Sequence, residues 1–220
     1  MLIVHHLNNS RSQRVLWLLE ELGLPYEIKF YQRDARTMLA PPELKRVHPL
    51  GKSPVLTEGD ATIAETGAIV EYLVEKAGGA LRPPQGTPER LRWTYWLHYA
   101  EGSAMPPLLM RLIFANLPAR SPLLMRPFVR AIAARTMAGY IEPQIRTHFD
   151  YLEGELTKST WFAGEDFSAA DVMMSFPLEA AGARAKVFVG RPKVKAFVDR
   201  CHARAAYQRA LGKGGPYAYA

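Results

Sequence analysis

The chain has 220 residues, of which 48% are hydrophobic and 22% are charged, a composition typical of a folded globular protein. Its apolar runs are far shorter than the roughly 20 residues of a membrane span, and its first residues lack the pattern of a secretory signal. The single cysteine, Cys201, excludes an intrachain disulfide, a CxxC redox pair and a cysteine-based zinc site. We therefore expect a cytoplasmic protein with one large or two small domains.

The net charge of +7 is unevenly distributed along the chain. Residues 1–80 carry nine basic and ten acidic side chains, whereas residues 81–220 carry nineteen and eleven. This asymmetry indicates two units of different character. It fits a nucleic-acid footprint, an attraction for anionic ligands or a solvated basic helical surface, and the last interpretation is favoured.

The first 77 residues alternate strand-like and helix-like patterns. The apolar run Leu2–His5 predicts a strand, and hydrophobic residues at helical spacing over Val15–Leu22 predict an amphipathic helix that ends at Gly23. Tyr26–Tyr31 predicts a second strand. Arg36–Val47 predicts a weak, irregular helix that a Pro-Pro pair interrupts.

A hairpin and a further helix complete this unit. Val55–Thr57 and Ala61–Ile63 read as strands joined by the three-residue connection Glu58–Asp60, and Glu65–Ala77 reads as a helix. The resulting order is βαβαββα. Strands joined through a helix should lie parallel, and the tight hairpin must be antiparallel, so we expect a small mixed sheet with helices on its faces.

Residues 78–88 are rich in glycine and proline and are interpreted as a linker. No convincing strand pattern follows it. Stretches rich in helix formers are residues 90–115, 125–155, 168–182 and 192–211. The predicted second domain, residues 89–220, is therefore an all-α bundle of about five helices.

Three short segments carry residues that fit a ligand site. The first is Asn8–Arg14, between the first strand and the first helix, where free N–H groups at the helix start can hold an anion. A hydroxyl here can also donate a hydrogen bond to a thiolate. Ordinary helix capping by Asn and Ser is the simpler interpretation of this segment alone.

The other two segments follow in the predicted sheet. A cis Ser53–Pro54 bond would leave the backbone of Ser53 free to pair with an extended peptide, and Lys52 could meet a carboxylate. Thr66 at a helix start could hold a second carboxylate, with Glu65 beside it for an ammonium group. A loop proline with a surface lysine, and an acidic residue at a helix start, are sufficient alternative explanations.

Together and in this order, the segments resemble the glutathione-binding domain of cytosolic glutathione transferases. The matching pieces are SRSQRVLWLLEELGLPYE (residues 10–27), HPLGKSPVL (48–56) and IAETGAIVEYL (63–73). With the helical remainder, the resemblance covers essentially the whole chain and is nearest to bacterial and fungal members with serine in the catalytic loop. It implies a thioredoxin-like N-terminal domain over residues 1–77 and a helical second-substrate domain.

The family resemblance implies a role for each matching position. Ser10 matches the serine that stabilises the glutathione thiolate, Ser12 and Arg11 are rival candidates, and Ser53 pairs with the cysteinyl backbone. Serine cannot act as a strong base, so it can only donate a hydrogen bond to the thiolate.

The same resemblance places the two ends of glutathione. Glu65 and Thr66 match the acidic and hydroxyl pair that holds the γ-glutamyl end, and Lys52 matches a residue near the glycyl carboxylate. Two departures from the family pattern, serine before the proline and threonine after the glutamate, conserve the backbone and hydroxyl chemistry. Glutathione is then a co-substrate, and no tightly bound cofactor is expected.

The implied reaction is thiolate attack on a hydrophobic electrophile, with glutathione-dependent peroxide reduction as a further activity. The implied assembly is a homodimer, in which Glu101 could reach the glutathione of a partner subunit. A non-catalytic binding module with the same fold is the alternative. Candidate residues of the second-substrate pocket are Tyr99, Met105, Leu109 and Phe114.

Several other functions are disfavoured by the sequence. The histidines fit no metal-ligand spacing such as HExxH, so no metal site is expected, and neither a GxSxG elbow nor a P-loop occurs. Residues 184–213 carry nine basic side chains and one acidic one, but few aromatics, which favours a solvated surface over nucleic-acid binding. The S-x-x-D spacing of Ser168 and Asp171 predicts a helix cap with a folding role.

Overall fold

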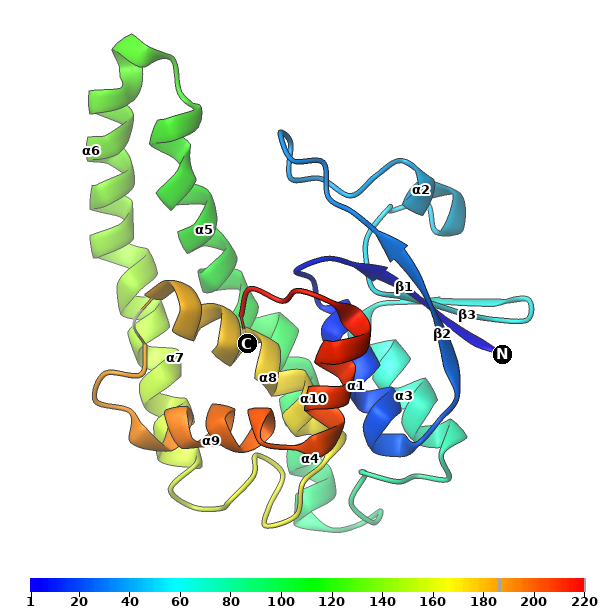
Figure 1. Cartoon of the computed structure of the whole chain (residues 1–220). Helices are drawn as coiled ribbons and strands as arrows, with labels where there is room; N and C mark the ends of the chain where they lie inside the picture. Colours follow the sequence, from blue (N-terminus) through cyan, green and yellow to red (C-terminus); the bar gives the residue numbers. More distant parts are fainter. Residues whose placement is uncertain (186, 220) are drawn as a thin grey trace.

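The computed structural model describes residues 1–185 and 187–219. The N-terminal part contains a four-stranded sheet and three helices (Figure 1). Its elements are β1 (Leu2–Leu7), α1 (Ser12–Leu22), β2 (Tyr26–Tyr31), α2 (Glu43–Val47), β3 (Val55–Glu58), β4 (Ala61–Ala64) and α3 (Thr66–Lys76).

The sheet has the strand order β2-β1-β3-β4, with β1 and β2 parallel and the other two pairs antiparallel. The predicted mixed sheet is therefore confirmed. The expectation that helix-joined strands lie parallel holds for β1 and β2 but is wrong for β2 and β3. These two strands lie on opposite sides of β1 and run in opposite directions, because the chain reverses in the long connection that contains the short helix α2.

Two local predictions need correction. The helix expected over Arg36–Val47 is reduced to α2, because the carboxylate of Asp34 accepts the backbone N–H groups of Arg36 and Thr37 and stabilises a turn instead. The hairpin loop has two residues and not three, since Glu58 pairs with Ala61. Its first loop residue is a glycine with a φ of 55°, a conformation that favours glycine.

Helix α1 lies at the centre of the molecule. It contacts α3 on one side, and α8 and α10 of the helical part on the other. All five residues of Val15–Leu19 are consequently fully buried, so this helix has no solvated face along that stretch. Each large apolar side chain buried there contributes about 1.5–3 kcal/mol. The catalytic-loop candidates at its N-terminus are thus attached to a rigid element.

As far as the structure describes it, the helical part begins at Pro88 and consists of two long, nearly continuous helices followed by three shorter ones. The first long helix comprises α4 (Pro88–Tyr99), the π-helix η1 (Ala100–Ala104) and α5 (Met105–Arg120). After a 3₁₀ turn, η2 (Leu123–Met125), the second comprises α6 (Arg126–Thr136), the π-helix η3 (Met137–Ile141) and α7 (Glu142–Glu155). The shorter helices are α8 (Ala169–Ala185), α9 (Pro192–His202) and α10 (Ala205–Gly214).

The all-helical architecture of the second part is confirmed, whereas the two π-helices were not foreseen. Each lies just before prolines, at Pro106-Pro107 and at Pro143. A proline cannot donate the usual i→i−4 hydrogen bond, so the helical hydrogen-bond ladder changes there. The division of the chain at residues 77 and 89 stays a prediction; in the structure, α3 ends at Lys76 and α4 begins at Pro88.

The start of α8 is held by the capping pair expected from the sequence. The carboxylate of Asp171 accepts hydrogen bonds from the backbone N–H of Phe162 (2.8 Å), the backbone N–H of Ser168 (2.8 Å) and the Ser168 hydroxyl (2.9 Å). Asp171 is completely buried, and this burial raises the pKa of its carboxyl from 3.8 to about 6. These contacts agree with a folding role for the pair. No helix in the described parts of the chain is long and apolar enough to cross a membrane.

Candidate functional site

A cleft of about 1200 Å³ lies between the two parts of the molecule. One wall comes from the sheet part: the loop after β1, the segment after β2 and residues 50–53. The other wall comes from α5, from α8 and from the C-terminal tail, Ala218–Tyr219. In Figure 1 these walls are the α5 helix on one side and the β2–α2 connection on the other.

Ser10 is the hydroxyl that the β1–α1 loop presents to the cleft. It lines the cleft although only 5% of its surface is exposed. Ser12, its rival, is completely buried and does not line the cleft. The Oγ atoms of Ser10 and Ser12 are 2.7 Å apart, and the backbone N–H of Ser12 donates to Ser10 Oγ over 3.2 Å. Ser10 is therefore the accessible member of a buried hydrogen-bonded pair.

A histidine lies at the inner end of this pair. The hydroxyl of Ser12 is 2.9 Å from Nδ1 of His6 and also 3.3 Å from the backbone carbonyl oxygen of Leu7. Burial lowers the pKa of His6, so its ring is held in the neutral form near pH 7. The Ser10 hydroxyl is thus positioned by a fixed chain of neutral polar groups.

Arg11 lines the cleft but is already paired with a carboxylate. Its Nε atom donates to both oxygens of Glu101, each at 2.9 Å. Glu101 also binds Arg14, which is completely buried and donates to the carbonyl oxygen of Met173 over 2.6 Å. Within this chain Glu101 neutralises two arginines, one in the β1–α1 loop and one in α1, and its contact with a partner subunit's glutathione stays a prediction.

Ser53 faces Ser10 across the bottom of the cleft, and the peptide bond that joins it to Pro54 is cis. Its hydroxyl donates to the carbonyl oxygen of His5 over 2.8 Å and lies 3.5 Å from the Ser10 hydroxyl. No described residue hydrogen-bonds to the backbone N–H or C=O of Ser53. An extended peptide can therefore pair with this backbone. Lys52 also lines the cleft.

Glu65 and Thr66 lie beside this backbone but are not among the residues that line the cleft. The pairing of Val55 with Ala64 places them next to Ser53, at the start of α3. Thr66 is buried and Glu65 is exposed, with a φ of 69° and a ψ of 123°. Such strained backbone is rare outside glycine and is concentrated at functional sites.

The apolar wall of the cleft is only partly the one expected. Of the four side chains expected in a second-substrate pocket, Met105 and Leu109 line the cleft. Tyr99 does not, because its ring packs against Trp96 and its hydroxyl is 2.6 Å from Nδ1 of His148 in the helical core. Phe114 is partly buried against the core and is likewise not a lining residue, so both assignments are corrected.

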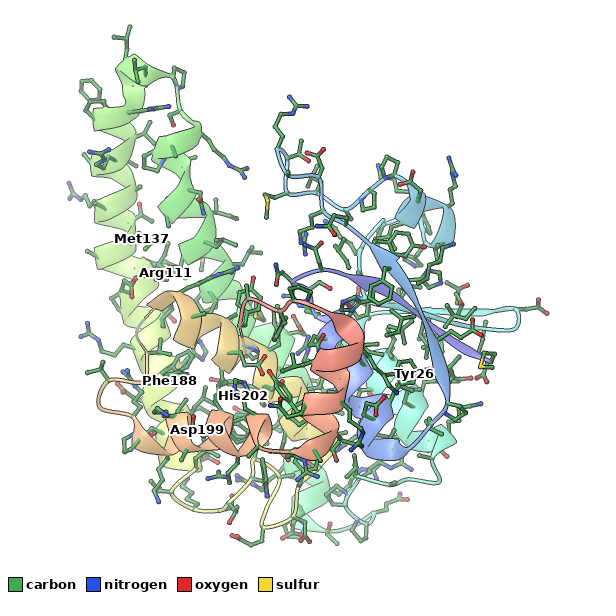
Figure 2. All side chains as sticks on the ribbon, in the orientation of Figure 1. Tyr26, Arg111, Met137, Phe188, Asp199 and His202 are labelled. Carbon is green, nitrogen blue, oxygen red and sulfur yellow. The ribbon has the colours of Figure 1, made fainter. Side chains whose placement is uncertain are left out.

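Sequence reasoning missed several lining residues. Leu108 and Leu112 join Met105 and Leu109 in an i, i+3, i+4, i+7 stripe on α5, a pattern that the sequence could have revealed. The sequence carries no such signal for four other lining residues, which are Arg33, Arg111, Phe176 and Arg184. Arg111 on α5 is labelled in Figure 2.

The C-terminal tail links the helical part to the β1–α1 loop. The backbone N–H of Ala218 donates to the side-chain oxygen of Asn9 over 2.8 Å. The hydroxyl of Tyr217 donates to the buried carboxylate of Glu179 over 2.7 Å. The tail therefore contacts the residue next to Ser10. Within residues 1–185 and 187–219, no three His, Cys, Asp or Glu side chains are grouped to hold a metal ion.

Comparisons with known proteins agree with this geometry. Residues 1–75 match the family model for the N-terminal domain of glutathione S-transferase, and residues 117–205 match the model for its C-terminal domain. The chain is 38% identical over 183 residues to glutathione S-transferase 3 of Schizosaccharomyces pombe, which covers 82% of this chain and 74% of that protein. It is 36% identical over 187 residues to glutathione S-transferase 1 of Saccharomyces cerevisiae, which covers 81% of this chain and 80% of that protein. The crystal structure of a glutathione S-transferase from Actinobacillus pleuropneumoniae aligns with a TM-score of 0.81 at 31% identity, covering 99% of this chain and 94% of that one.

Proposed function

Because this chain belongs to the glutathione S-transferase family and is an enzyme of that family, we propose that glutathione binds extended in its interdomain cleft with the thiol at Ser10. The observation that carries this proposal is the position of the Ser10 hydroxyl. It is the member of the Ser10–Ser12 pair that lines the cleft, and it lies beside the unpaired backbone of Ser53.

The hydroxyl of Ser10 can stabilise a thiolate without acting as a base. A free thiol with a pKa of about 8.5 is roughly 3% ionised at pH 7, and lowering its pKa by two units requires about 2.7 kcal/mol. A hydrogen bond to a charged group supplies about 1.5–3 kcal/mol, and the N-terminus of α1 adds about 0.3–1 kcal/mol. The O–H of Ser10 donates a hydrogen bond to the thiolate sulfur, while the N–H of Ser12 donates to Ser10 Oγ and fixes its position.

The remaining groups align the tripeptide. The N–H and C=O of Ser53 pair with the cysteinyl backbone as an added strand. The first N–H groups of α3, at Thr66, and the carboxylate of Glu65 receive the γ-glutamyl carboxylate and ammonium group. Lys52 meets the glycyl carboxylate. Arg11 borders the thiol and is held there by Glu101.

The apolar stripe of α5 receives the second substrate. In conjugation, the thiolate attacks an electrophilic carbon, a new S–C bond forms and the leaving group departs with its electron pair. In peroxide reduction, the thiolate attacks an O–O bond, which gives an alcohol and a glutathione sulfenic acid. A second glutathione then condenses with the sulfenic acid to give glutathione disulfide and water.

Calorimetric titration with reduced glutathione near pH 7 tests this proposal. We expect saturable binding with about one site per chain. The absence of binding, both by calorimetry and by a second method, would contradict it. None of the described residues argues for the non-catalytic binding module that the sequence also allowed.

A homodimer is part of the proposal. Apolar side chains are exposed on one face of α6, the clearest being Phe128 and Ile132, which are four residues apart and each more than 60% exposed. Burial of such a face against a second copy removes this apolar surface from water. Sedimentation equilibrium is expected to give twice the mass of 24.7 kDa, and a concentration-independent single-chain mass would contradict the assignment.

A cytoplasmic location is also proposed, because the reaction consumes reduced glutathione and the cytosol keeps thiols reduced. The one cysteine, Cys201, is free and buried. Cell fractionation with an antibody to this chain tests the location, and recovery from an oxidising compartment would contradict it.

A further inference from the structure

The charged residues that line the cleft are all cationic. No aspartate or glutamate lines it within the described parts of the chain. The cationic lining residues are Arg11, Arg33, Lys45, Lys52, Arg111 and Arg184. A purely apolar ligand gains no electrostatic attraction from this positive charge, whereas an anionic ligand does.

Two of these cations are neutralised by carboxylates outside the cleft lining. Arg11 is paired with Glu101 at 2.9 Å, and Arg111 is paired with Glu142 at 2.8 Å. Lys52 is assigned above to the glycyl end of glutathione. Three cations remain, and none of them forms an ion pair with any carboxylate of the described residues. Lys45, on α2, lies against Gly51 and so beside Lys52, at the glycyl end of glutathione. The other two are Arg33 and Arg184.

Arg33 is held in place by neutral groups of the β1–α1 loop and of the segment after β2. Its guanidinium donates to the backbone carbonyl oxygens of Asn8 at 3.2 Å, Met38 at 3.1 Å and Asn9 at 3.5 Å. It is therefore fixed at the rim of the catalytic loop with its full charge. Neutral carbonyls orient a guanidinium without cancelling that charge.

Arg184 reaches the same space from α8. It donates to the hydroxyl of Tyr219, and its guanidinium lies 4.7 Å from the centre of that ring. Burial lowers the pKa of Arg33, and the positive charges of Arg11 and Arg184 lower it further, against an opposing effect of Tyr219. The two arginines, one from each wall, thus face a shared region of the cleft.

The two arginines line the same cleft as the apolar stripe Met105–Leu112 of α5 and as Phe176, whose ring packs against that of Tyr219. We propose that the second substrate is an apolar electrophile that carries a carboxylate, which binds between Arg33 and Arg184 while its apolar part lies along α5. The inference rests on the proposed function and names the substrate class of the same site. Arginine binds a carboxylate with two parallel hydrogen bonds, which also orients the electrophilic carbon toward the thiol.

The glutathione carboxylates use other groups. Pairing with Ser53 directs the tripeptide along the sheet part, toward Lys52 at one end and Thr66 at the other. Arg33 lies on the opposite side of the β1–α1 loop, where its guanidinium donates to the backbone carbonyl oxygens of Asn8 and Asn9, the two residues before Ser10. The Arg33–Arg184 pair is therefore assigned to the second substrate.

Two electrophiles that differ only in charge test the inference: a chlorodinitrobenzoate and its methyl ester. The ratio of kcat/KM for the benzoate to that for the ester is compared among wild type, Arg33→Gln and Arg184→Gln. We expect each substitution to lower this ratio about tenfold or more, as for the loss of a charge-assisted hydrogen bond. Arg184→Lys should restore part of it, since it keeps the charge.

Arg146→Gln is the matched control, because Arg146 is an exposed arginine of α7 outside the cleft lining. Its ratio is expected to equal that of wild type. Using a ratio cancels any general loss of folded enzyme. If Arg33→Gln disrupts the loop and inactivates the enzyme, Arg184→Gln decides alone, since Arg184 is exposed on its helix.

An unchanged ratio in Arg184→Gln would overturn the inference. So would a rise in the KM for glutathione with both electrophiles, which would assign the arginine pair to glutathione itself. If wild type binds glutathione and converts the ester, but the substitutions leave the benzoate-to-ester ratio unchanged, only this inference is contradicted. A wild type that does not bind glutathione contradicts the proposed function instead.

Discussion

The hydroxyl oxygens of Ser10 and Ser12 lie 2.7 Å apart, one on the surface of the cleft and one completely buried. The sequence left both serines as candidates for stabilising the thiolate, and this arrangement gives each of them a different role. Ser10 can contact a ligand, whereas Ser12 is surrounded by the ring of His6, the backbone of Leu7 and Ser10 itself. Ser12 is therefore a positioning residue.

Ser10→Ala is expected to lower kcat/KM at neutral pH by about tenfold to a hundredfold, roughly the loss of one hydrogen bond to the thiolate. The free energy of unfolding should also fall, by about 1–3 kcal/mol, because the substitution leaves the buried N–H of Ser12 without its acceptor. Steady-state kinetics with saturating electrophile measure the rate. Full activity in Ser10→Ala, combined with inactivity in Ser12→Ala or Arg11→Ala, would show that another residue stabilises the thiolate.

Ser12→Ala is expected to act mainly on stability. It removes the partner of the Ser10 hydroxyl, the His6 ring and the Leu7 N–H, all within a buried region. Unsatisfied buried polar groups cost about 1–3 kcal/mol, which urea denaturation would detect. Equal stability of Ser12→Ala and wild type would contradict the buried role of this hydroxyl.

Glu101→Ala is expected to destabilise the fold strongly. It leaves Arg14 buried without its carboxylate, and removing one partner of a buried pair costs about 3–5 kcal/mol. Glu142→Ala is the matched control, since it breaks the part-exposed pair with Arg111, worth about 0–1 kcal/mol. Similar unfolding midpoints for the two variants would contradict the distinction between them.

Asp171→Asn tests the raised pKa of a buried carboxyl. The pKa of Asp171 is about 6 in the folded protein against 3.8 ordinarily, so between these values the folded chain keeps a proton that the unfolded chain has lost. The stability contributed by this group is therefore present at low pH and is lost as the pH rises through 6. The stability of wild type relative to Asp171→Asn should fall by about 3 kcal/mol across that window.

Urea denaturation of both proteins at several pH values measures this difference. Asp60→Asn, in the exposed turn between β3 and β4, is the control for replacing a surface aspartate. If wild type becomes more stable relative to Asp171→Asn as the pH rises from 4 to 6, the assigned direction of the pKa shift is contradicted.

Tyr217→Phe is expected to loosen the C-terminal tail. The substitution removes the hydroxyl that donates to Glu179, and it weakens the attachment of Ala218 to Asn9. The loss of a hydrogen bond to a buried charged group lowers stability by about 1–3 kcal/mol. Tyr140→Phe, on an exposed tyrosine, is the control. Faster hydrogen exchange at Ala218 in Tyr217→Phe alone would support the assignment, and identical exchange in both variants would contradict it.

Local patterns predicted most of the N-terminal part. β2 occurs at the predicted Tyr26–Tyr31, and α1 covers the predicted stripe. These elements could be predicted because the hydrophobic periodicity that defines a helix or a strand extends over only a few neighbouring residues. The prediction of a helix over Arg36–Val47 failed because the Asp34 side chain accepts hydrogen bonds from nearby backbone N–H groups, a local competition that helix propensity does not capture.

The site was predictable only where its residues belong to short sequence motifs. Ser10 and Ser53 were found through motifs and lie 3.5 Å apart. Tyr99 was misplaced because helical spacing alone does not show which face of α4 packs in the core. Arg33 and Arg184 were missed because they come from opposite walls, far apart in the chain, and only the folded structure brings them to one cleft.

The most direct test of the account is the pKa of the glutathione thiol bound in the cleft, followed by the ultraviolet absorbance of the thiolate as the pH is raised. We predict a bound thiol pKa about two units below that of free glutathione in wild type, and a return toward the free value in Ser10→Ala. A wild-type thiol pKa equal to that of free glutathione, or one that Ser10→Ala leaves unchanged, would contradict the assignment of Ser10.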